Sequence, residues 1–584
     1  MTLTIVGAPN TPTVDRCGCC ATHPALRSMV DRIVPRALDR RPAFGATSHR
    51  QPHADLLVVG RVVTMSSFRP QAGALAVTDG RITALGTLDE LSGLRGPDTE
   101  VLELGDRVAY PGFVEPHMHL WISALFDGFV DCSAYQHDTV DGVIDALRAA
   151  VASTPAGQWV TGRSFDPSLY PGTPDLTVDI LDTIAPHHPV FVINASLHFA
   201  YLNSQAFERA GIAADAPDPE GGRFERADGR LTGVIAEMGA IGAVVAALPQ
   251  LSQDAMMANL EAVARRASTV GVTSLREAAT GGLFGGAEFD LLRQMAADGR
   301  LPTRVTTAFI STARHAIESA GLRPGDGDDM VRAVAWKVIA DGSNQGRSGF
   351  LRQPYLGTGG RGSSNFSPEV LEEEIGYGHR QGWQVMTHAN GDAAIDAVLD
   401  AYQPVLTHGP SELRHRIEHC SITDDGQLAR MAELGLSPSF LIDHVGHWGR
   451  AFRDTLLGPE RAGRLDRVAG AVAHGLRPSL HSDYAVSPIH PLRAVQTAVT
   501  RVMHDGGEVL NPAERVDVAT ALRAVTIDAA WQNHADQLVG SLEVGKAADL
   551  VVLSADPTEV DPSGIAEIVV EETRLAGTVV HRSA

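Results

Sequence analysis

Cysteine is scarce in this chain of 584 residues, which contains five. Five unevenly placed cysteines cannot form a disulfide framework, so we expect a reducing, cytoplasmic location. Long apolar runs are also missing, because none approaches the roughly 18–20 residues of a membrane-spanning helix. The first 30 residues lack the basic start and apolar centre of a secretory signal. These absences favour a protein that neither spans a membrane nor enters a secretory route.

Positive charge is deficient as well. Lysine and arginine total 48 against 70 aspartates and glutamates, which leaves a net charge of −22. This excess of acidic residues argues against nucleic acid or an anionic membrane as a partner. A hydrophobic content of 44% and a charged content of 20% are ordinary for a globular protein. We therefore expect a small-molecule substrate as the partner, with a homodimer as an open alternative.

Residues 1–53 differ in character from the rest of the chain. They carry scattered proline, arginine and threonine and only one helix-like stretch, so we interpret them as an N-terminal extension. Cys17, Cys19 and Cys20 cluster there with His23 close behind. Cys17 and Cys20 have Cys-x-x-Cys spacing, but no second cysteine pair completes a structural zinc site. A metal or redox role for this segment stays a minor alternative.

Short strand-like runs lie near both ends of the chain. Residues 55–65 and 73–85 alternate apolar runs with turns, and Asp79-Gly80 is a strong hairpin signal. Similar runs at 548–553, 568–571 and 575–581 close the chain. We therefore predict a small β-sandwich domain assembled from residues 54–110 and 539–584.

The middle of the chain repeats an apolar run followed by a helical stretch. Eight such units predict an α/β fold, a (β/α)₈ TIM barrel over residues 111–538, with its active site at the C-terminal ends of the strands. Residues from about 125 to 265 are too many for one unit and are predicted to be an insertion. The runs are 271–275, 304–310, 334–339, 384–388, 416–419, 436–441 and 477–483, together with the run that enters His117.

The segment His117-Met118-His119 closes the first predicted strand. Side chains at positions i and i+2 of a strand share one face, so both imidazoles can reach a single ion. Taken alone, the pair could equally be two hydrogen-bonded histidines beside a Pro-Gly turn. The other strands decide between these interpretations. They place Lys337 in strand four and His388, His419 and Asp483 at the ends of strands five, six and eight, and such ends converge in a barrel.

At this point the sequence resembles the amidohydrolase superfamily, specifically the amidohydrolase-3 branch called YtcJ-like, to which N-substituted formamide deformylases are similar. The resemblance covers residues from about 54 to the C-terminus. The segments that carry it are Pro-Gly-Phe-Val-Glu-Pro-His-Met-His at 111–119, Lys-Val-Ile-Ala-Asp-Gly-Ser at 337–343, His-Ala-Asn-Gly-Asp at 388–392, His-Arg-Ile-Glu-His at 415–419, residues 481–483, and Gly-Lys-Ala-Ala-Asp-Leu at 545–550.

The resemblance implies a distorted barrel beside the β-sandwich and a centre of one or two divalent metal ions, most often zinc. His117, His119 and Asp483 would bind the buried metal. His388 and His419 would bind a second, or one of them would contact the substrate. Lys337 stands where related enzymes carry a metal-bridging lysine carbamate, and the alternative is an unmodified lysine paired with a carboxylate.

The predicted catalytic residues are Asp483, Lys337 and His419. A metal ion lowers the pKa of bound water toward about 7. Asp483 can then take the proton of the water and deliver it to a leaving amine. His481 stands where related sequences often carry a small residue, and we expect it to lie behind the ligands rather than among them.

Weaker signals point to substrate-binding residues. His198 and Tyr201 lie in a run that resembles the pocket-lining segment of the family, and Trp448 could add an apolar wall. The alternative for the aromatic side chains is that they belong to the core. Glu237 is a candidate pocket carboxylate. Arg347 could bind a substrate carboxylate, or equally form a surface salt bridge.

These patterns together predict a metal-dependent hydrolase of a C–N amide bond, acting on an N-acyl or N-formyl amine with an apolar substituent. Ester or lactone hydrolysis, deamination and decarboxylation on the same centre are the alternative reactions. A non-catalytic binding protein is the alternative from another class. The complete set of six ligand positions argues against it, because a protein without catalysis does not need them.

Overall fold

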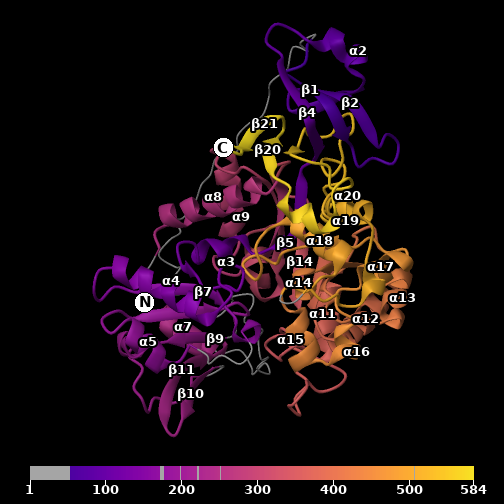
Figure 1. The fold of residues 1–584 in the computed structure, drawn as a ribbon. Helices are drawn as coiled ribbons and strands as arrows, with labels where there is room; N and C mark the ends of the chain where they lie inside the picture. The colour runs from indigo at the N-terminus through magenta and orange to yellow at the C-terminus, as the bar shows by residue number, and fades with distance from the viewer. Residues whose placement is uncertain (1–52, 171–175, 198, 220–221, 250, 505–506) are drawn as a thin grey trace, which may run out of the picture.

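The computed structural model describes residues 53–584, apart from 171–175, 198, 220–221, 250 and 505–506. Three parts follow one another in space (Figure 1): a β domain that holds both ends of the described chain, a central barrel, and a third sheet beside the barrel. The predicted extension over residues 1–52 lies outside the described residues, and so do Cys17, Cys19, Cys20 and His198. Within the described part of the chain, no helix combines the length and apolar character needed to cross a membrane.

The predicted barrel is confirmed. Eight parallel strands form one sheet, and each of them pairs with the barrel strand that follows it in the sequence. The first and last strands meet through the residues that follow them. The Asp483 amide donates to the His117 carbonyl at 3.1 Å, and the His119 amide donates to the Tyr484 carbonyl at 2.7 Å. The strands are β5 (Phe113–Met118), β12 (Val272–Thr280), β13 (Arg304–Ile310), β14 (Val331–Ile339), β15 (Gln384–Ala389), β16 (Arg416–His419), β17 (Ser437–Phe440) and β18 (Ser479–Leu480).

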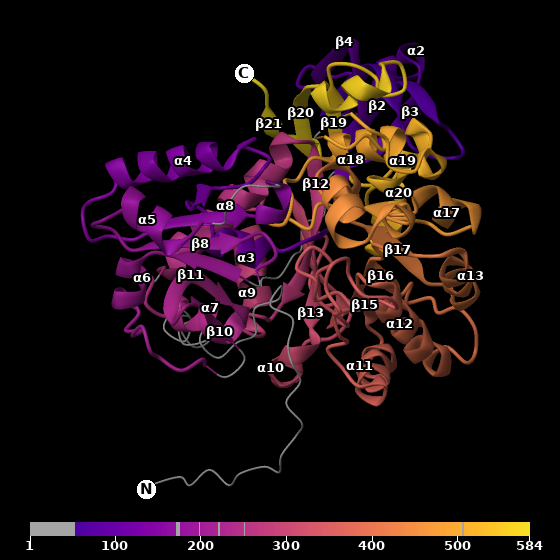
Figure 2. The ribbon, with the colours of Figure 1, turned by 60° about the horizontal axis from the view of Figure 1, so that its bottom comes forward.

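Helices cover the outside of the barrel (Figure 2). Several begin with a clear N-terminal signal: Ser367 caps the helix that has Pro368 in its first turn, and Asp424 forms a capping box with Gln427. Each buries an apolar side against the strands. These helices are α8 (Gln253–Thr269), α9 (Ala287–Ala297), α10 (Arg314–Ser319), α11 (Pro368–Arg380), α12 (Asp392–Val405), α13 (Asp425–Leu434), α17 (Val468–Ala473), α18 (Pro491–Thr500), α19 (Val518–Ala524) and α20 (Ile527–Gln532).

The two ends of the described part of the chain build one β domain, as predicted. Its seven strands lie in the order β21-β20-β19-β4-β1-β2-β3. Asp79 and Gly80 both take positive φ values in the turn between β2 and β3, which is the conformation that an Asp-Gly hairpin requires. The sheet curls over, because Ile82 of β3 exchanges backbone hydrogen bonds with Lys546 and Gly545 just before β19. The bounds are β1 (Leu56–Val63), β2 (Gln71–Thr78), β3 (Arg81–Gly86), β4 (Glu100–Pro111), β19 (Leu550–Leu553), β20 (Val570–Leu575) and β21 (Thr578–Arg582).

The chain between β5 and β12 forms a sheet of its own beside the barrel (Figure 1). Its strands lie in the order β10-β11-β9-β8-β7-β6 and bury a separate apolar core with α4 (Val140–Ser153) and α5 (Val178–Ile184). The strands are β6 (Val130–Asp131), β7 (Val160–Phe165), β8 (Val190–Asn194), β9 (Phe199–Leu202), β10 (Arg223–Ala227) and β11 (Arg230–Ala236). The C-terminal ends of β7 and β8 lie against the barrel loops: Asp166 accepts from Trp448 Nε1 at 3.0 Å, and Asn194 lines a cavity together with Gln345.

Candidate metal centre

Three predicted ligands meet where β5 and β18 close the barrel. The Asp483 Oδ1 atom lies 3.2 Å from His119 Nε2 and 3.4 Å from His117 Nε2. All three side chains are buried. His117 and His119 lie two positions apart, so the strand turns both toward the same side. Asp483 adopts a φ of 52°, which turns its carboxylate toward them at a backbone cost of about 1–3 kcal/mol.

These three groups fit a divalent cation. Their donor atoms all lie within 4.8 Å of one another. Ligands at roughly 2.1 Å from a tetrahedral ion lie roughly 3.4 Å apart, close to the separations seen between the imidazoles and the carboxylate. Burial lowers the pKa of His117 to about 3, so this imidazole is neutral and able to act as a ligand. Two imidazoles and a carboxylate are a donor set that suits zinc.

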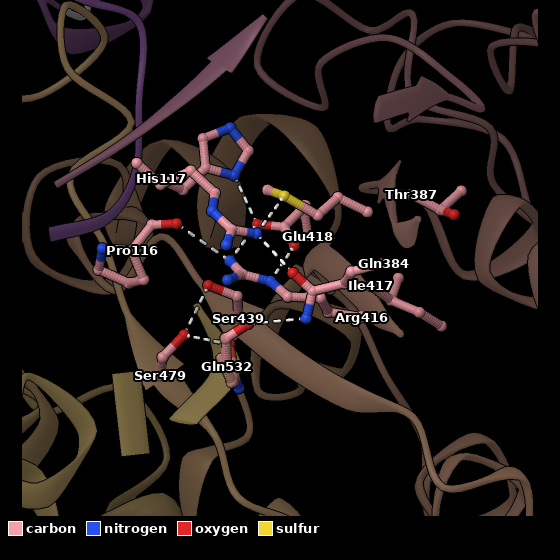
Figure 3. Close-up of polar contacts among 12 residues, drawn as sticks. Pro116, His117, Gln384, Thr387, Arg416, Ile417, Glu418, Ser439, Ser479 and Gln532 are labelled. Carbon is pink, nitrogen blue, oxygen red and sulfur yellow. Dashed lines mark hydrogen bonds and ion pairs between the residues drawn. The ribbon is translucent and has the colours of Figure 1, made fainter. Parts of the chain in front are cut away.

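Glu418 holds His117 from behind. Its Oε2 atom lies 2.5 Å from His117 Nδ1, which leaves the Nε2 lone pair directed at the cluster (Figure 3). Arg416 binds both oxygens of Glu418, at 2.6 and 2.8 Å. Burial opposes ionisation, but Arg416 and His117 hold the pKa of Glu418 well below its ordinary range. The carboxylate is therefore ionised, and it fixes both the tautomer and the orientation of His117.

The other predicted ligands lie around the same point. Lys337, on β14, is buried and places Nζ 3.1 Å from His117 Nε2. The rings of His388 and His419 have centroids 4.5 Å apart, and His419 Nδ1 lies 3.9 Å from Asp483 Oδ2. All six positions predicted to hold metal are thus brought together from five strands.

Loop residues position His388. Its Nε2 atom lies 3.1 Å from the Gly342 carbonyl and 3.1 Å from Asn390 Nδ2. Asp341 organises this loop, because its carboxylate accepts from the amides of Asn390, Gly391 and, at 2.9 Å, Phe350. Asp341 therefore shapes the loop after strand β14.

A further imidazole lies behind the ligands. The His481 ring stacks on His117 with centroids 4.8 Å apart, and His481 Nε2 lies 3.3 Å from His419 Nδ1. Ser439 Oγ is 2.8 Å from His481 Nδ1. His481 is buried, its nitrogens contact Ser439 and His419, and together with His117 and Glu418 it forms a second group of donor atoms within 4.8 Å of one another.

The sequence model of the amidohydrolase family matches residues 100–581. The chain belongs to the amidohydrolase family.

Two curated relatives span almost the whole amidohydrolase chain. N-substituted formamide deformylase from Arthrobacter pascens is 30% identical over 542 residues, which cover 90% of this chain and 98% of the relative. The putative amidohydrolase YtcJ from Bacillus subtilis is 28% identical and covers 90% and 99% of the two chains. These matches confirm the resemblance predicted from the sequence.

Solved structures support the fold. A metal-dependent hydrolase from Pyrococcus horikoshii, described as uncharacterized, superposes with a TM-score of 0.69 at 22% identity. The alignment covers 87% of this chain and 99% of the other. At this level of identity the likeness shows a shared architecture of barrel and β domain.

Next to the candidate metal centre of this amidohydrolase, buried polar side chains fill part of the barrel interior (Figure 3). The sequence did not predict this group. Arg276 of β12 donates to Gln384 of β15 at 2.5 Å, and Arg416 donates to the Asn533 side chain at 2.8 Å. Both arginines are fully buried. Glu418 lies within the segment 415–419 that carries the family resemblance, but no role was predicted for it. The signal that could have found it is its place two residues after Arg416 on a strand, which puts both charges on the inner face.

Glu115 is a second residue that sequence reasoning missed. Its carboxylate accepts from the Ser482 amide at 3.1 Å and so supports the turn that carries Asp483. Burial raises the pKa of Glu115 to about 8. It lies two residues before His117, on the same strand face, and that spacing is the signal that could have revealed it.

A cavity of about 220 Å³ lies between the third sheet of this amidohydrolase and the loop after β14. Tyr201 lines it and accepts a hydrogen bond from Asn194 at 3.0 Å. Asp166 also lines it and accepts from Trp448 Nε1 at 3.0 Å. Trp448 has no exposed surface and so supports the wall from behind. Gln345 also lines it and lies three residues after Gly342, whose carbonyl contacts His388, so one loop borders both the cavity and the candidate centre.

Two predicted substrate-binding residues, Glu237 and Arg347, do not line this cavity. Glu237 begins α7 (Glu237–Val245) with a φ of 65° and is half-buried. Arg347 is exposed and has a φ of 57°, directly after Gly346, which lines the cavity. Of the two, Arg347 lies next to the cavity in the chain.

Proposed function

We propose that this amidohydrolase cleaves the C–N bond of an N-formyl or N-acyl amine with a divalent cation, zinc, held by His117, His119 and Asp483. The convergence of these three buried donors carries the proposal. The identity of 30% with an N-substituted formamide deformylase supports the choice of bond. The bound cation would supply two effects: it lowers the pKa of water toward about 7 and polarises the substrate carbonyl.

The side chains around the cation have different roles in the proposed reaction. Asp483 is the proton carrier, because its two oxygens face both histidine pairs. It receives the proton of the attacking water and passes it to the nitrogen of the leaving amine, which becomes a neutral product. His388 and His419 hold a second cation or orient the carbonyl oxygen. Burial of the whole set excludes bulk water and strengthens each of these interactions.

Lys337 is proposed to carry a carbamate that bridges two cations. The neutral amine would add CO₂ and release one proton, which gives an anionic oxygen donor beside His117. Lys337 and Lys546 are the two lysines of the chain, so the modification is easily located. Native mass spectrometry at neutral pH should show the mass of one added CO₂, lost in Lys337→Met and kept in Lys546→Arg. The same mass in Lys337→Met would exclude the bridge.

The cavity beside the centre is proposed to receive the amine substituent. Phe199 and Val234 supply apolar surface, while Tyr201 and Asn194 supply hydrogen-bonding groups. A substituent with an aromatic or alkyl body and one polar group matches this lining. Tyr201→Phe should raise the KM for substrates that carry the polar group and leave the KM for plain alkyl substrates unchanged.

The decisive experiment combines metal analysis with a substrate panel. The purified enzyme is stripped, reloaded with zinc and assayed on N-substituted formamides, N-acetyl amines, esters, lactones and amino-substituted heterocycles. We expect turnover of formamides or N-acyl amines that disappears on stripping. Turnover confined to esters, lactones or deamination substrates would overturn the proposed bond. Zinc-loaded enzyme that turns over nothing in the panel would overturn hydrolysis itself.

A further inference from the structure

The cavity between the third sheet and the loop after β14 has an acidic lining. Asp166 and Glu225 line it, and no lysine, arginine or histidine lines it among the residues that the structure describes. Glu225 already pairs with Arg223 at 2.9 Å, and both of these side chains are partly exposed. Asp166 follows β7 directly and is only 5% exposed. A ligand that enters the cavity therefore meets a buried carboxylate.

Asp166 is held by uncharged groups. Its Oδ2 atom accepts from Trp448 Nε1 at 3.0 Å, and its Oδ1 atom accepts from the backbone amide and the hydroxyl of Ser168 at 2.9 and 2.7 Å. Within the described part of the chain no positively charged side chain forms an ion pair with it, and Arg163, three residues earlier, pairs with Asp131 at 2.7 Å instead. Burying a charge without a counter-charge is costly, so a buried carboxylate beside a cavity favours a ligand that supplies positive charge.

Gln345 adds a second acceptor from the barrel side of the cavity. Its Oε1 atom is buried and has no hydrogen-bond partner among the described residues. A buried acceptor without a partner costs free energy, so a ligand that donates a hydrogen there gains affinity. An ammonium group has three donors and no acceptor, which matches both Asp166 and Gln345. Phe199 and Val234 add apolar surface to the same cavity of about 220 Å³, which suits an alkyl stem.

We propose that this cavity binds an ammonium group at the free end of the amine substituent, so that the substrates are N-formyl or N-acyl derivatives of a diamine. The inference rests on the proposed C–N cleavage and names the substrate class for it. A primary alkyl amine is protonated at neutral pH, because its pKa lies at about 10. Its positive charge pairs with Asp166, one of its hydrogens reaches Gln345 Oε1, and its alkyl stem contacts Phe199 and Val234.

The other end of the same molecule can reach the candidate metal centre. Gln345 lies three residues after Gly342, whose carbonyl contacts His388, so one loop borders both places. The net charge of −22 also favours a cationic substrate over an anionic one. Arg347 favours the opposite charge, but it is exposed and does not line the cavity. A substrate that carries a carboxylate at this end is therefore the alternative that the test must exclude.

The test measures the binding of product-like amines to the full-length enzyme by calorimetry, not turnover. Unbranched diamines with two to six carbons are compared with hexylamine, in which a methyl group replaces one ammonium of 1,5-diaminopentane, and with 6-aminohexanoate, which ends in a carboxylate. We expect the diamine whose length fits to bind about 10- to 100-fold more tightly than hexylamine, the gain from hydrogen bonds to a charged group. 6-Aminohexanoate should bind more weakly than hexylamine, because its carboxylate would face Asp166.

Asp166→Asn should remove most of this preference and leave the affinity for hexylamine unchanged. The amide keeps the shape of the side chain, and asparagine caps the turn that follows as well as aspartate does. Gln345→Leu should cause a smaller loss of diamine affinity. Asp182→Asn is the matched control, because Asp182 also accepts from the amide and hydroxyl of a serine, Ser204, at 2.8 and 2.7 Å, but does not line the cavity. It should bind every amine like the wild type.

Equal affinity for hexylamine and for every diamine, or tighter binding of 6-aminohexanoate, would overturn the inference. A loss of hexylamine affinity in Asp166→Asn as large as the loss for the diamine would also overturn it, because a structural role would explain both. If Asp166→Asn does not fold, the wild-type comparison of amines and Gln345→Leu still decide the case. Because binding needs no turnover, a diamine preference in an enzyme that hydrolyses only esters would overturn the proposed reaction and not the cavity's preference. Cleavage of formamides without that preference would do the reverse.

Discussion

His117 and His419 are supported from behind in different ways. His117 faces the ionised carboxylate of Glu418, itself held by Arg416, whereas His419 faces the uncharged ring of His481. A charge-assisted hydrogen bond is shorter and roughly twice as strong as a neutral one, and the distances of 2.5 and 3.3 Å follow that order. The carboxylate makes His117 a more basic ligand, while the His481 ring only orients His419. We therefore expect the His117 side to bind its cation more tightly.

Asp483 contacts both sides, so its substitution should have the largest effect on turnover. Asp483→Asn keeps the shape of the side chain but removes the base that accepts the proton of water. We expect kcat to fall about 10³-fold, within the range for loss of a positioned acid–base group. Elemental analysis should show that part of the cation is retained. Full activity in this variant would exclude Asp483 as the proton carrier.

Glu418→Gln should have the next largest effect, because it removes the negative charge that orients His117. It leaves Arg416 buried without its counter-charge, and breaking a buried ion pair costs about 3–5 kcal/mol. We expect a lower thermal unfolding midpoint and a cation affinity reduced about 10- to 100-fold.

The double variant Glu418→Gln, Arg416→Met separates these two effects. It removes the uncompensated charge, so the unfolding midpoint should partly recover. The cation affinity should stay low, because His117 still lacks its carboxylate. Recovery of both quantities would show that Glu418 acts on stability alone.

The sequence was sufficient to predict the barrel, and it named six candidate ligand positions that the structure brings close together. Each ligand follows an apolar run, and barrel strands bring their C-terminal ends together whatever the loops do. The supports behind the ligands could not be predicted in this way. Glu418 meets His117 across 301 residues of sequence, and Gln532 reaches Ser479 from a helix rather than a strand. Their roles depend on which side chains face inward together, and a single strand pattern does not specify its distant neighbours. The third sheet was predicted only as an insertion, because its length signals an addition without indicating its strand order.

Removal of bound cation should show that the His117 side and the His419 side bind it with different affinities. During titration with a chelator, cobalt(II) loaded in place of zinc should leave in two steps, and the weaker step should belong to the His419 side. His388→Ala should remove the weaker step and leave the stronger one. A ligand present at 1,000 times its Kd stabilises the folded state by about 4.1 kcal/mol, so loss of the tighter ion should lower the unfolding midpoint more. A single step with one cation bound would show that His388 and His419 contact the substrate instead.

The smallest effect is expected at Ser479, which contacts none of the six predicted ligand positions. Ser479→Ala removes the hydroxyl that donates to Gln532 and Ser439, but it leaves Ser439 and His481 in place. A neutral hydrogen bond contributes about 0.5–1.5 kcal/mol, and only part of that reaches His419 through two intervening groups. Chelator titration should show a loss of cobalt affinity well below that of Glu418→Gln. A loss as large as that of Glu418→Gln would mean that the neutral groups behind His419 hold it as firmly as Glu418 holds His117.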